Sequence, residues 1–431
     1  MKTPPKTTTV TSVTVRMYNV GFGDCFLVTL HNSVGADVTM LFDCGRHSGT
    51  LLDAPDFWAV VQQVIKDLPK RNDKPFVDVI VMTHRHRDHV HGFSKPALWE
   101  EVTAGQVWMP WTENDKDPVA NGLRKQQDTT ARNALRALRA LGTSPSSGAY
   151  GLALNSITNE SAMTTLRRLG GPNIRYLPDP LTPASTVLTN GMPSGVTVHV
   201  LGPSRDPKVI RTLDPPNGQA YLRLAVDEDS QKELDEPDGP VLTSTPTIPA
   251  PWGGRYDRPA AEVYERLRAP APAAKLDDKL LDYVRTSSRT DGENLAFSVD
   301  QALNGTSLVL LLEVGPLVLL FPGDAQWGTW SEILAAPAWQ EKLHNTKFLK
   351  VGHHGSHNAT PVDFVEKGYL KNATAMVSVS DTAYDTEGWK AIPKKELLAA
   401  LTSKKRVTNL IRSDTLGPTE LFTEVTLAVG P

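Results

Sequence analysis

The feature that most constrains this chain is an apolar strand that ends abruptly in a cluster of metal-ligand side chains. The stretch reads Val79-Ile-Val-Met-Thr-His-Arg-His-Arg-Asp-His-Val-His-Gly92, and its valine-rich start is typical of a strand buried on both faces. The polar part carries His84, His86, Asp88 and His89. Imidazole and carboxylate donors at this spacing form the mixed ligand set that suits zinc or a neighbouring first-row dication. The sequence therefore predicts a strand that delivers metal ligands to the edge of a sheet.

Four donors within six residues favour two adjacent metal sites over a single site. In an extended loop His84 and His86 project the same way, whereas Asp88 and His89 lie beyond the bend. We expect the first pair to bind one divalent cation and the second pair to bind another, with Zn2+ favoured and Mn2+ as the alternative. The competing interpretation makes all four side chains ordinary packing or surface residues.

Two later strands end in the same kinds of side chain. One ends in a carboxylate, in the stretch Leu317-Val-Leu-Leu-Phe-Pro-Gly-Asp324. The other is followed by paired histidines, in the stretch Phe348-Leu-Lys-Val-Gly-His-His-Gly-Ser356. A dinuclear centre needs a carboxylate to hold two cations about 3.5–4 Å apart, and Asp324 is placed to bridge them. The competing role for Asp324 is the N-cap of a helix that begins near Gln326, a role worth about 1 kcal/mol.

Either of the paired histidines, His353 or His354, is expected to complete the second site, and the sequence does not distinguish them. Three nearby residues are candidates for leaving-group protonation or phosphate contact: Lys350, Ser356 and His357. The alternative is that they have an ordinary structural role in the loop. The candidate catalytic residues are Asp88, Lys350 and His357.

The order of these motifs resembles the metallo-β-lactamase superfamily, whose signature is His-x-His-x-Asp-His after a buried strand. The opening strands look like those of one branch, the metallo-β-lactamase-like domain of the ComEC DNA-uptake proteins: Met17-Tyr-Asn-Val-Gly-Phe-Gly-Asp-Cys-Phe-Leu-Val28 and Leu41-Phe-Asp-Cys-Gly45. Asn304-Gly-Thr-Ser-Leu308 and Pro393 fit the same branch. The resemblance covers residues 13–92 and about 290–425.

This resemblance implies a four-layer αββα sandwich and a hydrolase in which a metal-bound hydroxide is the nucleophile. It also implies an orienting role for Asp43 beside the histidine loop. Many members supply a further first-site histidine between the main motif and the bridging Asp. Beyond His91, the only histidine in that interval is His199, whose alternating strand favours a structural role. The first site is therefore expected to be weak or open.

Hydrophobic periodicity predicts two sheets face to face with helices outside. A turn near Asn32–Gly35 joins two strands of the first sheet, and a helix over Phe57–Leu68 that begins after Asp56 covers that sheet. Trp111, at the end of a later strand, is expected either to pack in the core or to line the cleft with Thr112 and Glu113. The other predicted elements are helices over 327–343 and 394–401 and strands over 196–203, 307–313, 317–321, 347–351, 375–379, 406–410 and 422–429.

Length and composition indicate a globular protein. With 431 residues and 40% hydrophobic residues, the chain can bury a sizeable core in a single domain over 13–431, after a loose leader over 1–12. No segment approaches the roughly 18 consecutive apolar residues of a membrane-spanning helix, so we expect no membrane partner and a cytoplasmic location. Cys25 and Cys44 lie on neighbouring core strands, and free thiols are favoured over a disulfide.

Two insertions interrupt the predicted domain. The first, about 118–170, has seven Lys or Arg residues against two acids, and a helix over Asp128–Leu141 would place Arg132, Arg136 and Arg139 opposite its apolar face. That basic face either meets phosphates or is simply solvated. The second, about 205–291, is acidic and proline-rich. It either caps the active site as a lid or forms a solvated loop with a short helix over Ala260–Leu267.

The favoured function is therefore a metal-dependent phosphodiesterase or nuclease acting on nucleic acid or a nucleotide, with single-stranded DNA or RNA as candidate substrates. A net charge of −3 provides no global basic field, so a nucleic acid would have to be bound by a local patch such as the first insertion. The first alternative is a hydrolase of a small ester, thioester or lactone. The second is a metal-binding scaffold without turnover, and the fold alone does not decide among them.

Overall fold

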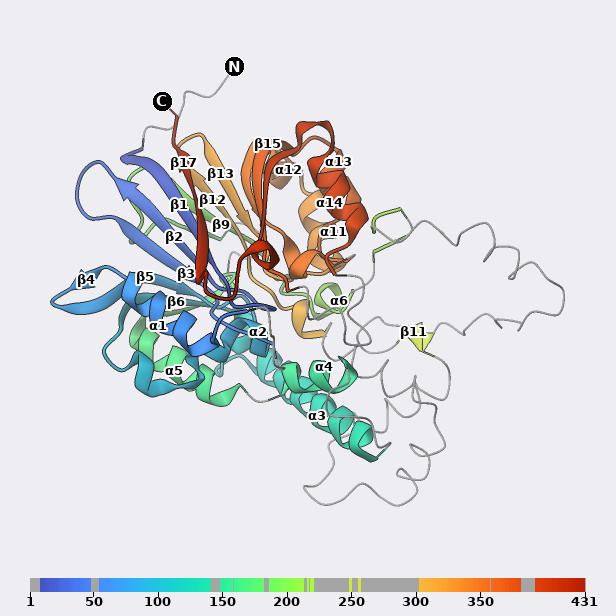
Figure 1. Cartoon of the computed structure of the whole chain (residues 1–431). Coiled ribbons are helices and arrows are strands. Elements are labelled where there is room, and N and C mark those ends of the chain that lie inside the picture. Colours follow the sequence, from blue (N-terminus) through green and yellow to red (C-terminus); the bar gives the residue numbers. More distant parts are fainter. Residues whose placement is uncertain are drawn as a thin grey trace.

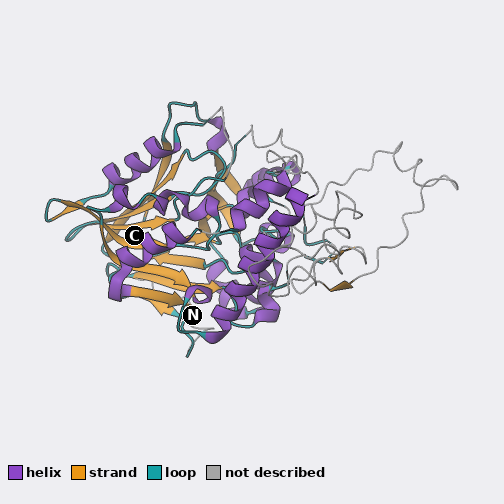
Figure 2. Ribbon diagram, turned by 90° about the horizontal axis from the view of Figure 1, so that it is seen from below, coloured by secondary structure: helices purple, strands orange, loops and turns teal. Residues whose placement is uncertain are grey.

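The computed structural model describes residues 8–47, 54–140, 148–157, 159–181, 186–212, 215–216, 218–220, 248–249, 255–256, 302–356, 358–380 and 392–430. Within these residues the chain forms two β-sheets packed face to face, with helices on their outer faces (Figure 1). Figure 2 shows the strands between helices when the molecule is seen from below. This is a mixed α/β protein, as the periodicity predicts.

The first sheet comes mainly from the N-terminal part of the chain. Its strands run in the order β17-β1-β2-β3-β5-β6-β7, with β4 beside β5. The β2–β3 pair is an antiparallel hairpin, and the pairing from β3 to β7 is parallel. The bounds are β1 Val10–Tyr18, β2 Phe26–Asn32, β3 Val38–Phe42, β4 Lys70–Arg71, β5 Lys74–Val81, β6 Thr103–Pro110, β7 Ile174–Leu177 and β17 Phe422–Ala428. Because β3 and β5 are parallel, their carboxyl ends meet at one edge of the sheet.

The second sheet has the strand order β16-β15-β14-β13-β12-β9-β8. An antiparallel hairpin joins β12 to β13, and β13 to β16 are parallel neighbours. The bounds are β8 Val187–Leu188, β9 Val196–Gly202, β12 Val309–Val314, β13 Leu317–Phe321, β14 Thr346–Lys350, β15 Leu370–Val377 and β16 Val407–Arg412. A separate pair is formed by β10 Ile248–Pro249 and β11 Arg255–Tyr256.

Apolar side chains from both sheets fill the space between them. Phe42 of the first sheet stacks on Phe321 of the second, with ring centroids 4.2 Å apart. Each is the last residue of its strand, β3 or β13. Such an aromatic pair contributes about 0.5–1.5 kcal/mol beyond its buried area. The contact therefore fixes the two strand ends, and the loops that follow them, against each other.

Helices cover the outer face of each sheet. Apolar residues of α1 and α5 pack on the first sheet, and those of α11, α13 and α14 pack on the second. The helix bounds are α1 Phe57–Asp67, α2 Arg87–Val90, α3 Pro118–Ala140, α4 Gly148–Ser156, α5 Glu160–Gly170, α6 Pro207–Ile210, α11 Trp327–Ala335, α12 Pro337–Leu343, α13 Val362–Glu366 and α14 Lys395–Thr402. None of the helices that the structure describes is long and apolar enough to span a bilayer.

Several element boundaries differ from the prediction. The helix predicted over 327–343 is two helices, because the chain leaves the helical conformation at Ala336 ahead of Pro337. The strand predicted over 375–379 is β15, which begins earlier, at Leu370. Trp111 is buried and its Nε1–H donates to the Ser204 carbonyl, which agrees with core packing.

Other predictions can be compared with the described residues only in part. Cys25 and Cys44 are both buried and free, so no disulfide joins them. The first insertion holds the helices α3, α4 and α5. In the second insertion, the helix predicted over Ala260–Leu267 lies outside the described residues, and so does most of the segment that was expected to form either a lid or a solvated loop.

The cap of α1 gives a direct test of the fold. The Asp56 side chain accepts a hydrogen bond from the Ala59 N–H at 2.8 Å, as an N-cap does. Replacing it by Ala leaves that N–H without its partner and should lower the free energy of unfolding by about 1 kcal/mol. Urea titration of Asp56→Ala beside Asp56→Asn measures this, since Asn keeps an acceptor. Equal losses in both variants would contradict the capping role.

Candidate metal centre

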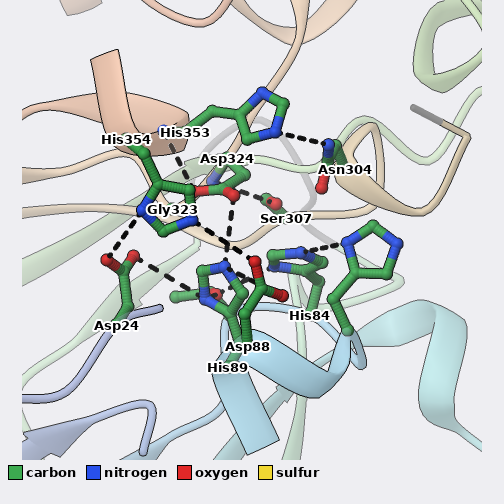
Figure 3. A network of polar contacts seen from close by, with 12 residues as sticks. Asp24, His84, Asp88, His89, Asn304, Ser307, Gly323, Asp324, His353 and His354 are labelled. Carbon is green, nitrogen blue, oxygen red and sulfur yellow. Dashed lines mark hydrogen bonds and ion pairs between the residues drawn. The ribbon is translucent and has the colours of Figure 1, made fainter. Parts of the chain in front are cut away.

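The ends of strands from both sheets meet at one place. The loop after β5 and the short helix α2 carry the motif from His84 to His89, the loop after β13 carries Asp324, and the loop after β14 carries His353 and His354. In Figure 3 the side chains of His84, Asp88, His89, Asp324 and His354 lie close together, whereas the His353 ring is turned toward Asn304. The histidines and aspartates at these strand ends are all buried: His84, His86, Asp88, His89, Asp324, His353 and His354. The three strands predicted to converge do so.

Glycines let the backbones of this region approach closely. A Cβ atom on Gly45 would lie 2.3 Å from the Asp88 carbonyl carbon and from the His89 nitrogen. Gly323, just before Asp324, has φ +55°, a conformation that favours glycine. Larger residues at these two positions would displace the motif loop or misdirect the Asp324 carboxylate.

The first pair of histidines, His84 and His86, presents one ring nitrogen of each toward the other, with 2.9 Å between His84 Nε2 and His86 Nδ1. The Thr83 hydroxyl donates to Asp43, so it accepts from His84 Nδ1, 3.1 Å away. The remaining nitrogen of His86, Nε2, lies 3.3 Å from Ser156 Oγ. The inward nitrogens can therefore bind one cation while the outward nitrogens are held by hydroxyl groups.

His89 and His354 are arranged in the same way, with one ring nitrogen in a hydrogen bond and the other facing the cluster. His89 Nδ1 donates to the acceptor-only carboxylate of Asp43 at 2.8 Å, and His354 Nδ1 donates to the Ser378 carbonyl at 2.7 Å. These bonds leave Nε2 of each ring facing the cluster. His89 Nε2 lies 3.1 Å from Asp324 Oδ2, and His354 Nε2 lies 3.3 Å from Asp88 Oδ2.

The two oxygens of Asp324 have different partners. Oδ1 accepts from Lys350 Nζ and from the His353 N–H, both at 3.0 Å, whereas Oδ2 faces His89. The helix α11 has Gln326 as its N-cap residue, and no side chain caps it. The capping role considered for Asp324 is therefore wrong, since its carboxylate points into the cluster instead.

The positions of the donors allow a metal ion to be held. Ligand atoms of His84, His89 and Asp324 lie within 4.8 Å of one another, and so do those of Asp88, His89 and His354. Asp88 Oδ1 is buried and has no hydrogen-bond partner among the residues that the structure describes. An unpaired buried carboxylate oxygen is costly, and a cation at this point would satisfy it. The residues present therefore fit a metal centre.

The charges around His89 favour a cation. Burial disfavours a charged imidazole, but Asp324, Asp43 and Asp88 outweigh it and raise the pKa of His89 well above its usual range. A field that stabilises an imidazolium also stabilises a divalent cation at the same point. Burial lowers the pKa of His86 to about 3, so this ring is neutral at pH 7, the form that binds metal.

Other predicted site residues have different surroundings. His353 turns away from the carboxylates, with Nε2 3.3 Å from Asn304 Nδ2 and Nδ1 2.9 Å from Ser356 Oγ. Lys350 is buried between Asp24 and Asp324. His357 lies outside the described residues. His199 Nε2 lies 2.5 Å from Glu313 Oε2 on the neighbouring strand β12, which agrees with a structural role.

Two sets of contacts were not predicted from the sequence. Asp24, which follows the Gly21-Phe-Gly23 turn, forms a buried ion pair with Lys350. Asn155 and Ser156, at the end of α4, contact the motif loop. The glycine-rich turn before Asp24 was a usable signal, because such turns bring backbone close to a site. Nothing local in the sequence marked the second pair.

No protein-family model matches the chain, and no curated protein matches it in sequence.

The paired histidines make different contacts, and this difference can be tested. His354→Ala removes the imidazole that faces Asp88 and should weaken the binding of one cation by more than the roughly 10–100-fold typical of losing a residue that only supports a ligand. His353→Ala is the matched control and should retain metal affinity. Zn2+ titration of the metal-free protein by calorimetry measures both. Weaker binding in His353→Ala than in His354→Ala would reverse the assignment.

Proposed function

We propose that this protein is a metal-dependent hydrolase of the metallo-β-lactamase type. The observation that carries the proposal is the shared arrangement of His84, His86, His89 and His354. Each ring has its outer nitrogen beside a separate partner and its inner nitrogen turned toward the other donors of the cluster. Metal-ligating histidines usually have their second nitrogen engaged in this way. The layered architecture and the order of the motifs support the same family.

Two cations are proposed to share the site. His84 and His86 would hold the first, and Asp88, His89 and His354 would hold the second. Asp324 would be the carboxylate shared by the two ions, with its Oδ1 kept in place by Lys350 and the His353 N–H. The donor set of histidine and carboxylate favours Zn2+, with Mn2+ as the alternative.

The bound cations would lower the pKa of water to about 7 and stabilise negative charge that develops on a phosphoryl or carbonyl oxygen. The protein residues have separate tasks. Asp43 holds His89 in the tautomer that directs Nε2 inward. Lys350 holds Asp324 Oδ1, which keeps the carboxylate in one orientation. Because Lys350 is only 3% exposed and bonds to Asp24 and Asp324, we assign it this support role rather than leaving-group protonation.

The proposed substrate class is a phosphodiester, with single-stranded DNA or RNA as candidates. Support comes from α3, which buries Ala131, Leu135 and Leu138 on one face and exposes Arg132 and Arg136. Arg132 forms an exposed salt bridge with Asp128 at 2.8 Å. Breaking such a surface salt bridge costs little free energy. A cytoplasmic location fits this substrate. Small-ester, thioester or lactone hydrolysis is the runner-up, and a non-catalytic metal scaffold is the second alternative.

The hydrolase proposal can be tested at Asp88. Asp88→Ala removes a proposed ligand and the unpaired Oδ1, so turnover should fall by orders of magnitude while the protein stays folded. Metal content is measured together with hydrolysis of single-stranded DNA, RNA, bis-p-nitrophenyl phosphate and a lactone, with and without Zn2+ or Mn2+. Asp73→Asn, in an exposed turn, is the control. An equally active Asp88→Ala protein would rule out the metallohydrolase assignment.

The substrate class is tested by reversing charge on α3. Arg132, Arg136 and Arg139 changed together to Glu should weaken binding of single-stranded DNA or RNA, and wild-type affinity should fall steeply with salt, because neutralised phosphates release counterions. Fluorescence anisotropy at several salt concentrations measures this. The same change at the exposed Lys371, Lys404 and Lys405 alters net charge equally and serves as the control. Salt-independent turnover of an uncharged ester would favour the runner-up.

A further inference from the structure

Three buried polar side chains at the junction of α4 and α5 contact the loop that carries the motif. Asn155 Oδ1 accepts the Asp88 N–H at 3.1 Å, and Asn159 Nδ2 donates to the Arg85 carbonyl at 2.6 Å. Ser156 Oγ lies 3.3 Å from His86 Nε2. Figure 1 shows α4 beside α2, the helix that the motif loop enters. The insertion therefore contacts both the backbone of this loop and one of its imidazole rings.

The insertion has contacts with the second sheet as well. Gln127 Nε2, on α3, donates to the Ala302 carbonyl at 3.3 Å. Ala302 lies shortly before Asn304 and Ser307 in the chain, and the Ser307 hydroxyl accepts from the Asp324 N–H at 3.2 Å. The first insertion therefore forms hydrogen bonds with loops of both sheets that make up the cluster. It also exposes arginines.

We propose that this helical insertion is a positioning element of the metal centre, in which the Ser156 hydroxyl fixes the ring of His86 with Nδ1 toward the metal. This inference rests on the proposed function. The other three inward-facing histidines are held by Thr83, Asp43 and Ser378, each from a loop of the two sheets. The His86 ring, by contrast, lies beside a residue of the insertion.

The dependence on Ser156 follows from the small number of ligands. The proposed first site would be held by His84, His86 and Asp324 only, because His199 is engaged with Glu313 elsewhere. With few ligands, the free energy of binding depends strongly on each ring being held in the binding orientation beforehand. Loss of the hydroxyl removes the group that lies beside His86 Nε2, so the first cation should bind more weakly while the second site is unaffected.

A cobalt titration tests this inference on the full-length metal-free protein. Wild type should bind two Co2+, and Ser156→Ala should weaken one of the two binding steps by about 10–100-fold and change its visible absorption. Ser156→Thr keeps the hydroxyl and should restore both. Ser161→Ala, which removes a hydroxyl bonded to the Ser94 carbonyl on the exposed side of α5, is the control.

The outcomes separate the two proposals. If wild type binds no Co2+, the proposed function and this inference both fail. If wild type binds two ions and Ser156→Ala titrates identically, only the inference is overturned. A purely structural contact would lower stability without changing one binding step selectively.

A second variant tests the positioning contact without any metal. Asn155→Ala removes the acceptor of the Asp88 N–H, so amide hydrogen exchange in the peptide covering 84–91 should become faster while the core strands keep their protection. Unchanged exchange in this peptide would overturn the claim that the insertion holds the loop.

Discussion

The stacked rings of Phe42 and Phe321 are the contact on which the geometry of the cluster depends. These rings end β3 and β13, one strand from each sheet, and the next residues along the chain lead to Asp43 and Asp324. The sheets are held together by apolar burial, which has no directional preference of its own. Close packing of the side chains between the sheets fixes their relative position, because a tightly packed core prevents one sheet from sliding over the other. Carboxylates from two separate sheets can therefore be held at hydrogen-bonding distance from one histidine.

That histidine links the two halves of the cluster electrostatically. Asp43 lies 2.8 Å from His89 Nδ1, and Asp324 lies 3.1 Å from Nε2 on the other side of the ring. Asp324 is itself held by Lys350, whose second carboxylate partner is Asp24. Buried charges of this kind are stable only when each is paired. The network thus alternates acids and bases, and a cation at the centre would take the place of the proton between His89 and Asp324.

The sequence predicted the parts of the fold whose signals are local. Apolar runs closing on ligand-type residues identified β5, β13 and β14, since a buried parallel strand and its polar end have a distinct composition. The sequence could not show that His354 rather than His353 faces Asp88, because this depends on two successive residues with positive φ. Asp24 and Ser156 were missed because their contacts with Lys350 and His86 join segments far apart in the chain. Whether the converging side chains bind metal stays a prediction.

The backbone of the paired histidines implies a conflict between two demands on one position. His353 and His354 have φ values of +44° and +51°, in a region where a residue with a Cβ atom pays about 1–2 kcal/mol relative to glycine. The His353 N–H bonded to Asp324 and the His354 ring bonded to Ser378 offset this cost. At His354, glycine would relax the backbone but would remove the imidazole that faces Asp88. A substitution that stabilises the loop at this position should therefore weaken the proposed metal site.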